Sequence, residues 1–435
     1  MKIFFILSFT LFFLYSCNTT KINPNIIVIM ADDLGYEGIS SFGNKIIKTP
    51  NLDKLANQGI KFTDFHSNGT VCTPTRAAFL TGLYPQRSGL EGVIYAKGET
   101  RALGLDPNSI TIADVLKENS YATSIIGKWH LGYKPKYNPI HYGFDDFFGY
   151  VSGNIDFHTH RDGAGYYDWY HNTDTIIETG YTTDLITKHS VNFIKKNKHN
   201  PFFLFVSHEA PHVPFQGRND PGFRKSPKEA DYYGPVKDTD RAYKEMIEIM
   251  DEGIGSIIET LEKEGILENT LVFFLSDNGA REFGHNGVLK GDKGSLFEGG
   301  HRVPAIAYWK NKIQSNISNQ ILMGFDLFPT IISILGIKIN DKLILDGVDF
   351  SPILFNSKYK SIARELYWRY RGQKAIRMNN NKLLITNNDT LLFDLSNDLQ
   401  EIVDLKNKNT DLTKTLVEKI IKWELEMDKY PEITN

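Results

Sequence analysis

Four short apolar segments alternate with longer helical segments along much of the chain. They are residues 25–30, 121–126, 201–206 and 271–275, and each is rich in branched or aromatic side chains. Segments of this length that are hydrophobic throughout are typical of strands buried on both faces of a parallel sheet. Residues 241–265 show apolar side chains at helical spacing. The alternation predicts an α/β fold, a large, mostly parallel mixed sheet flanked by helices.

The C-terminal part of the chain has a different pattern. Short strand-like segments occupy residues 365–370, 373–378, 382–386 and 391–395, and an amphipathic helical pattern follows at residues 411–427. Short strands separated by Asn and Gly turns predict a small antiparallel sheet, here followed by a helix. A chain of 435 residues is long enough for one large domain and a smaller one. We therefore expect a main domain over residues 22–360 and a C-terminal subdomain over residues 361–435.

The N-terminus has the features of an export leader. Lys2 precedes an almost wholly apolar stretch over residues 3–15, which is too short to span a membrane comfortably. Residues 14–17 read Leu-Tyr-Ser-Cys, which is similar to a bacterial lipobox, whose cysteine is lipidated. Residues 1–17 are therefore predicted to be a signal peptide with a lipobox, with plain secretion as the alternative. This places the mature protein in the periplasm or cell envelope, with membrane contact only through a lipid on Cys17.

Oxygen-bearing side chains follow two of the predicted strands. Asp32 and Asp33 come soon after the first strand, and Asp277 and Asn278 come soon after the fourth. In a parallel sheet such residues converge at the edge where the strands end. A set of hard oxygen ligands suits Ca²⁺ better than Zn²⁺. Each pair taken alone could equally be a turn, because Asp and Asn favour turns.

A helix is predicted to begin next to a cysteine. The chain has only two cysteines, so if Cys17 carries a lipid, Cys72 has no disulfide partner. Pro74 suits the first turn of a helix and Gly82 suits its end. Cys72 would then lie at a helix N-terminus, where backbone N–H groups favour an anion, and Arg76 could reach back to it. A thiol in this position could be a nucleophile with a low pKa.

The sequence around this cysteine resembles that of a known enzyme family. Residues 72–76, Cys-Thr-Pro-Thr-Arg, match the Cys-x-Pro-x-Arg signature of the formylglycine-dependent (type I) sulfatases of the alkaline-phosphatase-like superfamily. Further similar motifs, in the family's order, are Gly-Lys-Trp-His-Leu-Gly at 127–132, Ala-Pro-His-Val-Pro at 210–214, Ser-Asp-Asn-Gly at 276–279, Lys-Gly-Asp-Lys-Gly at 290–294 and Glu-Gly-Gly-His-Arg-Val-Pro at 298–304. The resemblance covers nearly the whole mature chain. It implies an alkaline-phosphatase-like fold and hydrolysis of sulfate monoesters.

The resemblance also implies roles for individual residues. In this family a maturation enzyme oxidises the motif cysteine to formylglycine (3-oxoalanine), and its hydrated form attacks sulfur. The implied ligands of one calcium ion are Asp32, Asp33, Asp277, Asn278 and the modified Cys72. The implied catalytic residues are Cys72, Arg76, Lys128, His130, His212 and Lys293. Arg76 and the two lysines would stabilise negative charge, His130 would act as a base, and His212 would protonate the leaving oxygen.

Residues 148–160 combine aromatic and polar side chains, which suits stacking on a sugar ring with hydrogen bonds to its hydroxyls. The predicted substrate-binding residues are Ser152, Asn154, Asp156, His158, His208 and His285. The expected substrate is a sulfated polysaccharide or its oligosaccharides. The alternative for this segment is an ordered loop without a ligand, and His208 could equally brace its own loop.

The charge of the chain and its set of predicted ligands limit which partners and functions we expect. The chain has 49 basic and 52 acidic residues and a formal net charge of -3, so a nucleic-acid partner, which requires a basic surface, is not expected. A phosphonate or phosphodiester hydrolase of the same superfamily is one alternative function, although a two-metal phosphatase would need further Asp and His ligands. A non-catalytic glycan-binding lipoprotein is the other, and the intact motif residues argue against it.

Overall fold

The computed structural model describes most of the chain. The described residues are 23–226, 234, 237–281, 283–340, 343–356, 359 and 363–430. The predicted leader, including Cys17, lies outside them, and so does the predicted boundary at residue 361. No helix in these ranges is both long and apolar enough to cross a membrane.

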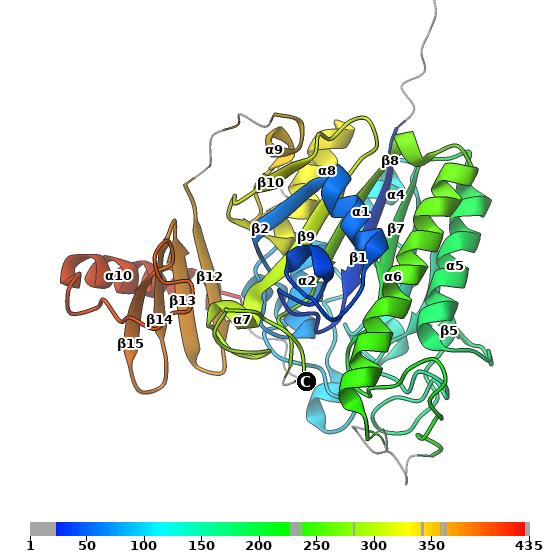
Figure 1. Ribbon diagram of the computed structural model, residues 1–435, viewed down its shortest axis with the longest axis horizontal. Coiled ribbons are helices and arrows are strands. Elements are labelled where there is room, and N and C mark those ends of the chain that lie inside the picture. Colours follow the sequence, from blue (N-terminus) through cyan, green and yellow to red (C-terminus); the bar gives the residue numbers. More distant parts are fainter. Residues whose placement is uncertain are drawn as a thin grey trace, which may run out of the picture.

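An eleven-stranded sheet forms the centre of the molecule (Figure 1). The strands run in the order β10–β2–β9–β8–β1–β7–β3–β4–β5–β6, and β11 also pairs with β2. Their bounds are β1 (Asn25–Ala31), β2 (Ile60–His66), β3 (Ala122–Lys128), β4 (Asp146–Tyr150), β5 (Tyr170–His171), β6 (Asp174–Thr175), β7 (Phe202–Ser207), β8 (Thr270–Ser276), β9 (Arg302–Tyr308), β10 (Asn316–Ser318) and β11 (Leu322–Met323). The four predicted strands are β1, β3, β7 and β8, which are neighbours and run parallel. Because β9 runs antiparallel to β8 and β2, the sheet is mixed, which confirms the predicted fold class.

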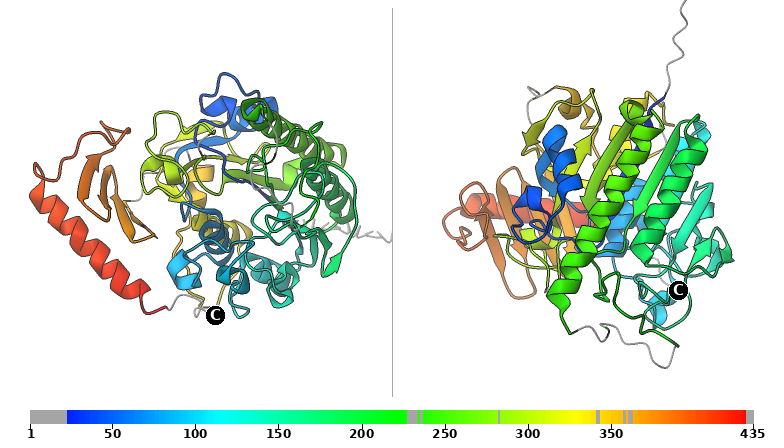
Figure 2. Two further views of the ribbon diagram at one scale, coloured as in Figure 1. Left: turned by 90° about the horizontal axis from the view of Figure 1, so that it is seen from below. Right: turned by 45° about the vertical axis from the view of Figure 1, so that its right-hand side comes forward.

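Helices cover both faces of this sheet. On one face lie α1 (Pro50–Gln58), α5 (Thr182–Asn197) and α6 (Thr239–Lys263), and on the other lie α2 (Cys72–Thr81), α4 (Ile112–Glu118), α8 (Leu327–Leu335) and α9 (Ser351–Phe355). Ile26 and Val28 of β1 pack toward the second group, whereas Ile27 and Ile29 pack toward the first. All four are fully buried, because successive side chains of a central strand point to opposite faces. Figure 2 shows α5 and α6 lying side by side across the sheet.

Short elements complete the main domain. They are α3 (Pro85–Ser88), α7 (Glu298–His301), η1 (Ser40–Phe42), η2 (Glu99–Ala102), η3 (Pro135–Tyr137), η4 (Pro139–His141), η5 (Leu267–Asn269) and η6 (Gly324–Asp326). The loop between α3 and η2 matters for the site, because it forms one side of the pocket beside α2.

A second, separate sheet lies beside the main domain, on the left in Figure 1. Its antiparallel strands are β12 (Glu365–Tyr370), β13 (Gln373–Met378), β14 (Asn381–Ile385) and β15 (Thr390–Asp394), followed by α10 (Thr410–Met427). Its outer face is covered by α10, as Figure 2 shows. Leu366 and Trp368 of β12 pack against Tyr84 and Phe325 of the main domain. The predicted antiparallel sheet with its closing helix is confirmed.

Candidate active site

The carboxyl ends of the central strands bring charged residues together at one edge of the sheet. Asp32 and Asp33 follow β1, and Asp277 and Asn278 follow β8, the neighbouring strand. The backbone N–H of Asp277 donates to the carbonyl of Ala31 (3.1 Å), and that of Asp33 donates to Asp277 Oδ1 (3.1 Å). All four side chains are buried. The predicted oxygen ligands therefore share one small volume.

Cys72 is the first residue of α2 and faces this edge. Its Sγ lies 3.3 Å from Asp32 Oδ1, 3.8 Å from Asp33 Oδ1 and 3.0 Å from Lys293 Nζ. Burial and the nearby Asp277 carboxylate raise the pKa of the Cys72 thiol, so the unmodified side chain is protonated at neutral pH. An unmodified Cys72 is thus a poor nucleophile, contrary to the low pKa that the helix N-terminus suggested.

Three cations are paired with the three carboxylates. Lys128 Nζ donates to Asp32 Oδ2 (2.6 Å), and Arg76 donates to Asp277 Oδ2 from Nη2 (2.8 Å) and Nε (3.1 Å). Lys293 Nζ donates to Asp33 Oδ1. Burial alone would raise the pKa of Asp33, but Lys293 and His212 outweigh it and hold that pKa below its usual range.

The donor atoms fit a divalent cation. Ligand atoms of Asp32, Asp33, Cys72 and His212 all lie within 4.8 Å of one another. Asp33 Oδ2 and Asn278 Oδ1 are buried without a hydrogen-bond partner. Burial and Asp277 raise the pKa of Asp32 to about 7 in spite of its pairing with Lys128. A cation among these oxygens would satisfy the two unpartnered atoms and favour the ionised form of Asp32.

Two of the predicted histidines line the pocket above Cys72. His212 Nε2 lies 3.6 Å from Asp33 Oδ2, and its Nδ1 is 2.6 Å from the carbonyl of Val213, to which it donates in the neutral ring. His130 Nε2 lies 3.0 Å from the carbonyl of Ile94, which leaves its buried Nδ1 without a partner. Burial and the nearby cations lower the pKa of both rings well below 6.5. Each histidine therefore carries a lone pair that can accept a proton.

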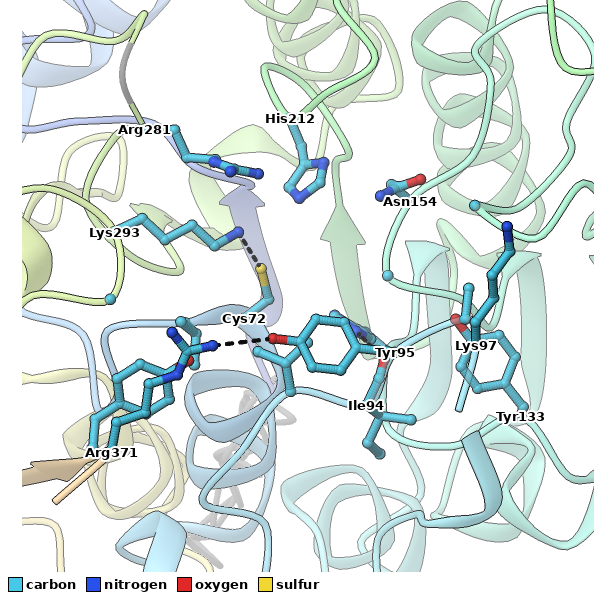
Figure 3. A pocket seen from close by; sticks show the side chains of 18 residues that line it. Cys72, Ile94, Tyr95, Lys97, Tyr133, Asn154, His212, Arg281, Lys293 and Arg371 are labelled. Atoms are coloured by element: carbon cyan, nitrogen blue, oxygen red, sulfur yellow. Dashed lines mark hydrogen bonds between the residues drawn. The ribbon is translucent and has the colours of Figure 1, made fainter. Parts of the chain in front are cut away.

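A pocket of about 430 Å³ opens over these residues (Figure 3). Cys72, His130, His212 and Lys293 line it, together with Asn154 from the predicted substrate loop. The same pocket is lined by residues that sequence reasoning missed, among them Tyr95, Lys97, Tyr133, Arg281, Tyr370 and Arg371. They had no motif to mark them, and an isolated Lys, Arg or Tyr on a loop is ordinarily a surface residue.

The other predicted substrate-binding residues do not line this pocket. The Asp156 carboxylate accepts four backbone N–H groups, including those of Phe223 and Arg224, so it holds two loops together. Ser152 Oγ donates to the carbonyl of Asn154 (2.9 Å), and His158 Nε2 lies 3.1 Å from the carbonyl of Gly217.

The remaining two histidines lie elsewhere. His208 is buried after β7 with neither ring nitrogen hydrogen-bonded, and burial lowers its pKa to about 3. His285 is exposed and outside the pocket. Its backbone carbonyl accepts a hydrogen bond from Glu37 (2.9 Å). Neither histidine is among the residues that line the pocket above Cys72.

Comparison with known proteins relates the chain to one family. The family model described as "Sulfatase" matches residues 24–337. N-acetylgalactosamine-6-sulfatase of Rattus norvegicus is 33% identical over 374 residues, 80% of this chain and 68% of that protein. Arylsulfatase A of Bos taurus is 32% identical over 375 residues, 77% of this chain and 68% of that protein.

Solved structures show the same fold. The structure described as "Ps i-CgsB in complex with k-i-k-neocarrahexaose" has a TM-score of 0.85 and 32% identity, and covers 95% of each chain. A phosphonate monoester hydrolase of Agrobacterium radiobacter has a TM-score of 0.68 at 19% identity, covering 93% of this chain and 96% of that one, a likeness of fold alone.

The fold and the site define an alkaline-phosphatase-like hydrolase with an acidic, metal-competent cluster beside a helix N-terminus. Within that class, the chain belongs to the sulfatase family and is a sulfuric ester hydrolase.

Proposed function

We propose that the protein removes sulfate from a sulfated polysaccharide or its oligosaccharides, with formylglycine at position 72 and one Ca²⁺ at the end of β1. The observation that carries this proposal is the arrangement around Cys72. Its side chain leads α2 and lies within 4 Å of two carboxylates and of Lys293. The aldehyde, once hydrated, supplies the oxygen nucleophile that the protonated thiol lacks.

The modification requires a partner. A formylglycine-generating maturation enzyme would have to reach Cys72 before folding is complete, because the side chain is almost fully buried in the folded protein. Mass spectrometry of the peptide spanning Cys72 tests this step. The unmodified cysteine mass in protein from a maturation-competent host would count against it.

Calcium is the proposed ion because the ligand set is dominated by oxygen. Asp32, Asp33, Asp277 and Asn278 would hold it, with the modified side chain at position 72. When bound, the ion supplies positive charge that polarises sulfate oxygens. Among the described residues only one of the two candidate clusters suits a metal ion, which favours a sulfatase over a two-metal phosphatase. The other His/Glu cluster of the described residues, around Glu298, contains Lys382 and Arg377, which would repel a cation.

The chain's own side chains provide the rest of the chemistry. Lys128 and Lys293 would hold negative charge that develops on the transferred group, and Arg76 fixes Asp277. His130, neutral through burial, would take a proton at Nδ1. His212 would deliver a proton to the leaving oxygen from Nε2, because a bound sulfate ester adds negative charge that raises the pKa of this histidine.

The substrate class is supported by the neighbours and by the pocket. One structural neighbour is in complex with k-i-k-neocarrahexaose, and a relative is named N-acetylgalactosamine-6-sulfatase. The pocket carries three tyrosines, Tyr95, Tyr133 and Tyr370, which suit contact with sugar rings.

The deciding experiment compares matured wild type with Cys72→Ala on 4-nitrophenyl sulfate, 4-nitrophenyl phosphate and sulfated oligosaccharides. Wild type should release sulfate faster than phosphate, and Cys72→Ala should release neither while remaining folded. Faster release of phosphate would favour the phosphonate or phosphodiester alternative. Unchanged turnover by Cys72→Ala would exclude the nucleophile proposed at this position.

The proposal also includes export to the cell envelope and lipidation of Cys17. Its basis is the apolar leader, which ends in Leu-Tyr-Ser-Cys. Fatty-acid labelling of wild type and Cys17→Ala, followed by membrane fractionation, tests both. Equal labelling of the two proteins would count against the anchor.

A further inference from the structure

The pocket of this protein has a charge opposite to that of the whole chain. Its described lining includes the cations Lys97, Arg281, Lys293 and Arg371 but no Asp or Glu. The chain as a whole has a formal net charge of -3. The positive charge is therefore placed at the pocket, where it can act on an anionic ligand.

The sulfate group that is cleaved does not account for all of this charge. Lys293 lies 3.0 Å from Cys72 Sγ and serves the reacting group. Lys97 and Arg371 are exposed, and among the described residues no carboxylate pairs with either of them. Figure 3 shows them on opposite sides of Cys72, with the ring of Tyr95 between them. A sulfate monoester has one negative charge, so these two cations remain available for another group.

Arg371 occupies a backbone position that disfavours its side chain. Tyr370 and Gln373 pair at the ends of β12 and β13, which makes Arg371 and Gly372 a two-residue turn with φ of 49° and 77°. Turns with two positive φ angles favour Asn, Asp or Gly at the first position. The next hairpin of the same sheet follows this preference with Asn379, whose φ is 53°. An arginine held in this conformation and lining a pocket indicates a functional demand on its side chain.

The local contacts direct the guanidinium toward the pocket. It lies 5.2 Å from the Tyr370 ring centroid and donates to the Tyr95 hydroxyl at 3.4 Å. Both tyrosines line the same pocket. The planar guanidinium can donate two parallel hydrogen bonds to a sulfate group.

We propose, building on the proposed function, that Arg371 binds a second sulfate on a sugar next to the one that is cleaved, with Lys97 adding positive charge across the pocket. The substrate is then a glycan with more than one sulfate within the length of the pocket. The C-terminal sheet supplies this specificity through its first hairpin, and the main domain supplies the reacting groups.

The test measures inhibition of 4-nitrophenyl sulfate hydrolysis by two sulfated galactan hexasaccharides with the same backbone, one and two sulfates per disaccharide. Wild type should bind the disulfated hexasaccharide at least about tenfold more tightly than the monosulfated one, because a charged bidentate contact is added. Arg371→Asn should remove most of this preference, and Arg371→Lys should retain part of it. The preference of wild type should shrink as salt is raised.

Asn at position 371 suits the turn, so Arg371→Asn should melt no lower than wild type, which separates binding from folding. Lys312→Gln is the matched control. It removes an exposed positive charge after β9, which runs antiparallel to β8 and so ends on the side of the sheet away from the pocket. This variant should keep the preference for the disulfated hexasaccharide. Tyr95→Phe removes the hydroxyl partner and should leave most of the preference.

Three results would overturn the inference: equal inhibition of wild type by the two hexasaccharides, an unchanged preference in Arg371→Asn, or the same loss in Tyr95→Phe as in Arg371→Asn. Failure of matured wild type to hydrolyse 4-nitrophenyl sulfate would instead contradict the proposed function, and this inference would fall with it.

Discussion

At the scale of single residues, the site is built from buried pairs of opposite charges. Lys293 illustrates this, because its ammonium group contacts both Asp33 and Cys72 and is part of the pocket wall. Asp33 and Cys72 raise the pKa of Lys293 well above its usual value in spite of burial, so the side chain stays charged. A fixed positive charge in a buried site stabilises developing negative charge more strongly than one in water does.

Replacing Lys293 with Ala should therefore lower kcat for 4-nitrophenyl sulfate by about 100-fold or more. The measurement is steady-state kinetics on matured protein, with thermal denaturation to show that the variant is folded. Lys312→Ala removes a lysine far from the pocket and should keep wild-type kinetics. A Lys293→Ala variant as active as wild type would exclude a role in the reaction.

His130 should set the acid limit of activity. Burial and Lys128 lower its pKa well below 6.5, so the ring stays neutral, and able to accept a proton, through mildly acidic pH. Activity that depends on the neutral ring is lost as the pH falls through this lowered pKa. We expect the acid limb of the pH profile of kcat, where the neutral His130 ring is lost, to lie below pH 6.5. An acid limb centred above pH 6.5 in stably folded protein would contradict this assignment.

At the scale of elements, the predicted oxygen ligands directly follow two neighbouring strands. β1 and β8 are in register from Asn25 with Thr270 to Ala31 with Ser276, so the side chains after them must meet. Asp33 Oδ2 and Asn278 Oδ1 are unpartnered at this junction, which is where the proposed cation would bind. Ligand binding to the folded state alone stabilises it by mass action.

Chelation with EGTA should accordingly abolish activity and lower Tm by roughly 5 °C or more. Added Ca²⁺ should restore both. Mg²⁺ should restore less, because it requires shorter bonds and stricter octahedral geometry than Ca²⁺. Activity and Tm that do not respond to EGTA would argue against a metal at this junction.

At the scale of the whole molecule, a buried ionic network joins the C-terminal sheet to the main domain. Glu298 of α7 accepts from Lys382 of β14 (3.0 Å) and from Arg377 of β13 (3.1 Å). Arg377 also donates to Asp64 of β2 at 2.7 Å and 2.8 Å. Burial alone would raise the pKa of Glu298, but Lys382 and Arg377 hold it well below its usual value. This network fixes the position of the sheet whose hairpin carries Arg371.

Glu298→Gln should destabilise the protein by about 3–5 kcal/mol, because it removes the buried carboxylate that Lys382 and Arg377 share and leaves their charge only partly compensated by Glu401 and Asp64. Urea unfolding followed by tryptophan fluorescence measures this change. The control is Glu264→Gln, which removes the half-buried surface partner of Lys198 and should change stability little. If Glu298→Gln proves as stable as wild type, the network does not hold the two parts together.

The sequence by itself determined the fold class, the oxygen ligands that follow β1 and β8, and the helix start at Cys72, whereas the other residues around Cys72 were predicted from the family resemblance. Apolar runs ending in Asp32 and Lys128 form parallel strands, and neighbouring parallel strands bring their carboxyl ends to one edge. The start of α2 at Cys72 followed in the same way from Pro74 and the residues after it. These features depend on local pattern and on the rules of sheet assembly, so they can be read along the chain.

Only the tertiary structure decided which residues form the rest of the pocket. Tyr95 and Arg371 are 276 residues apart in the chain and touch through two loops with no shared pattern. Asp156 was expected to contact substrate. Its carboxylate instead accepts hydrogen bonds from the backbone N–H groups of Phe223 and Arg224, in a loop more distant in the sequence. Such contacts form when elements distant in the chain pack together. They depend on the whole fold, so the residues next to them in the sequence do not specify them.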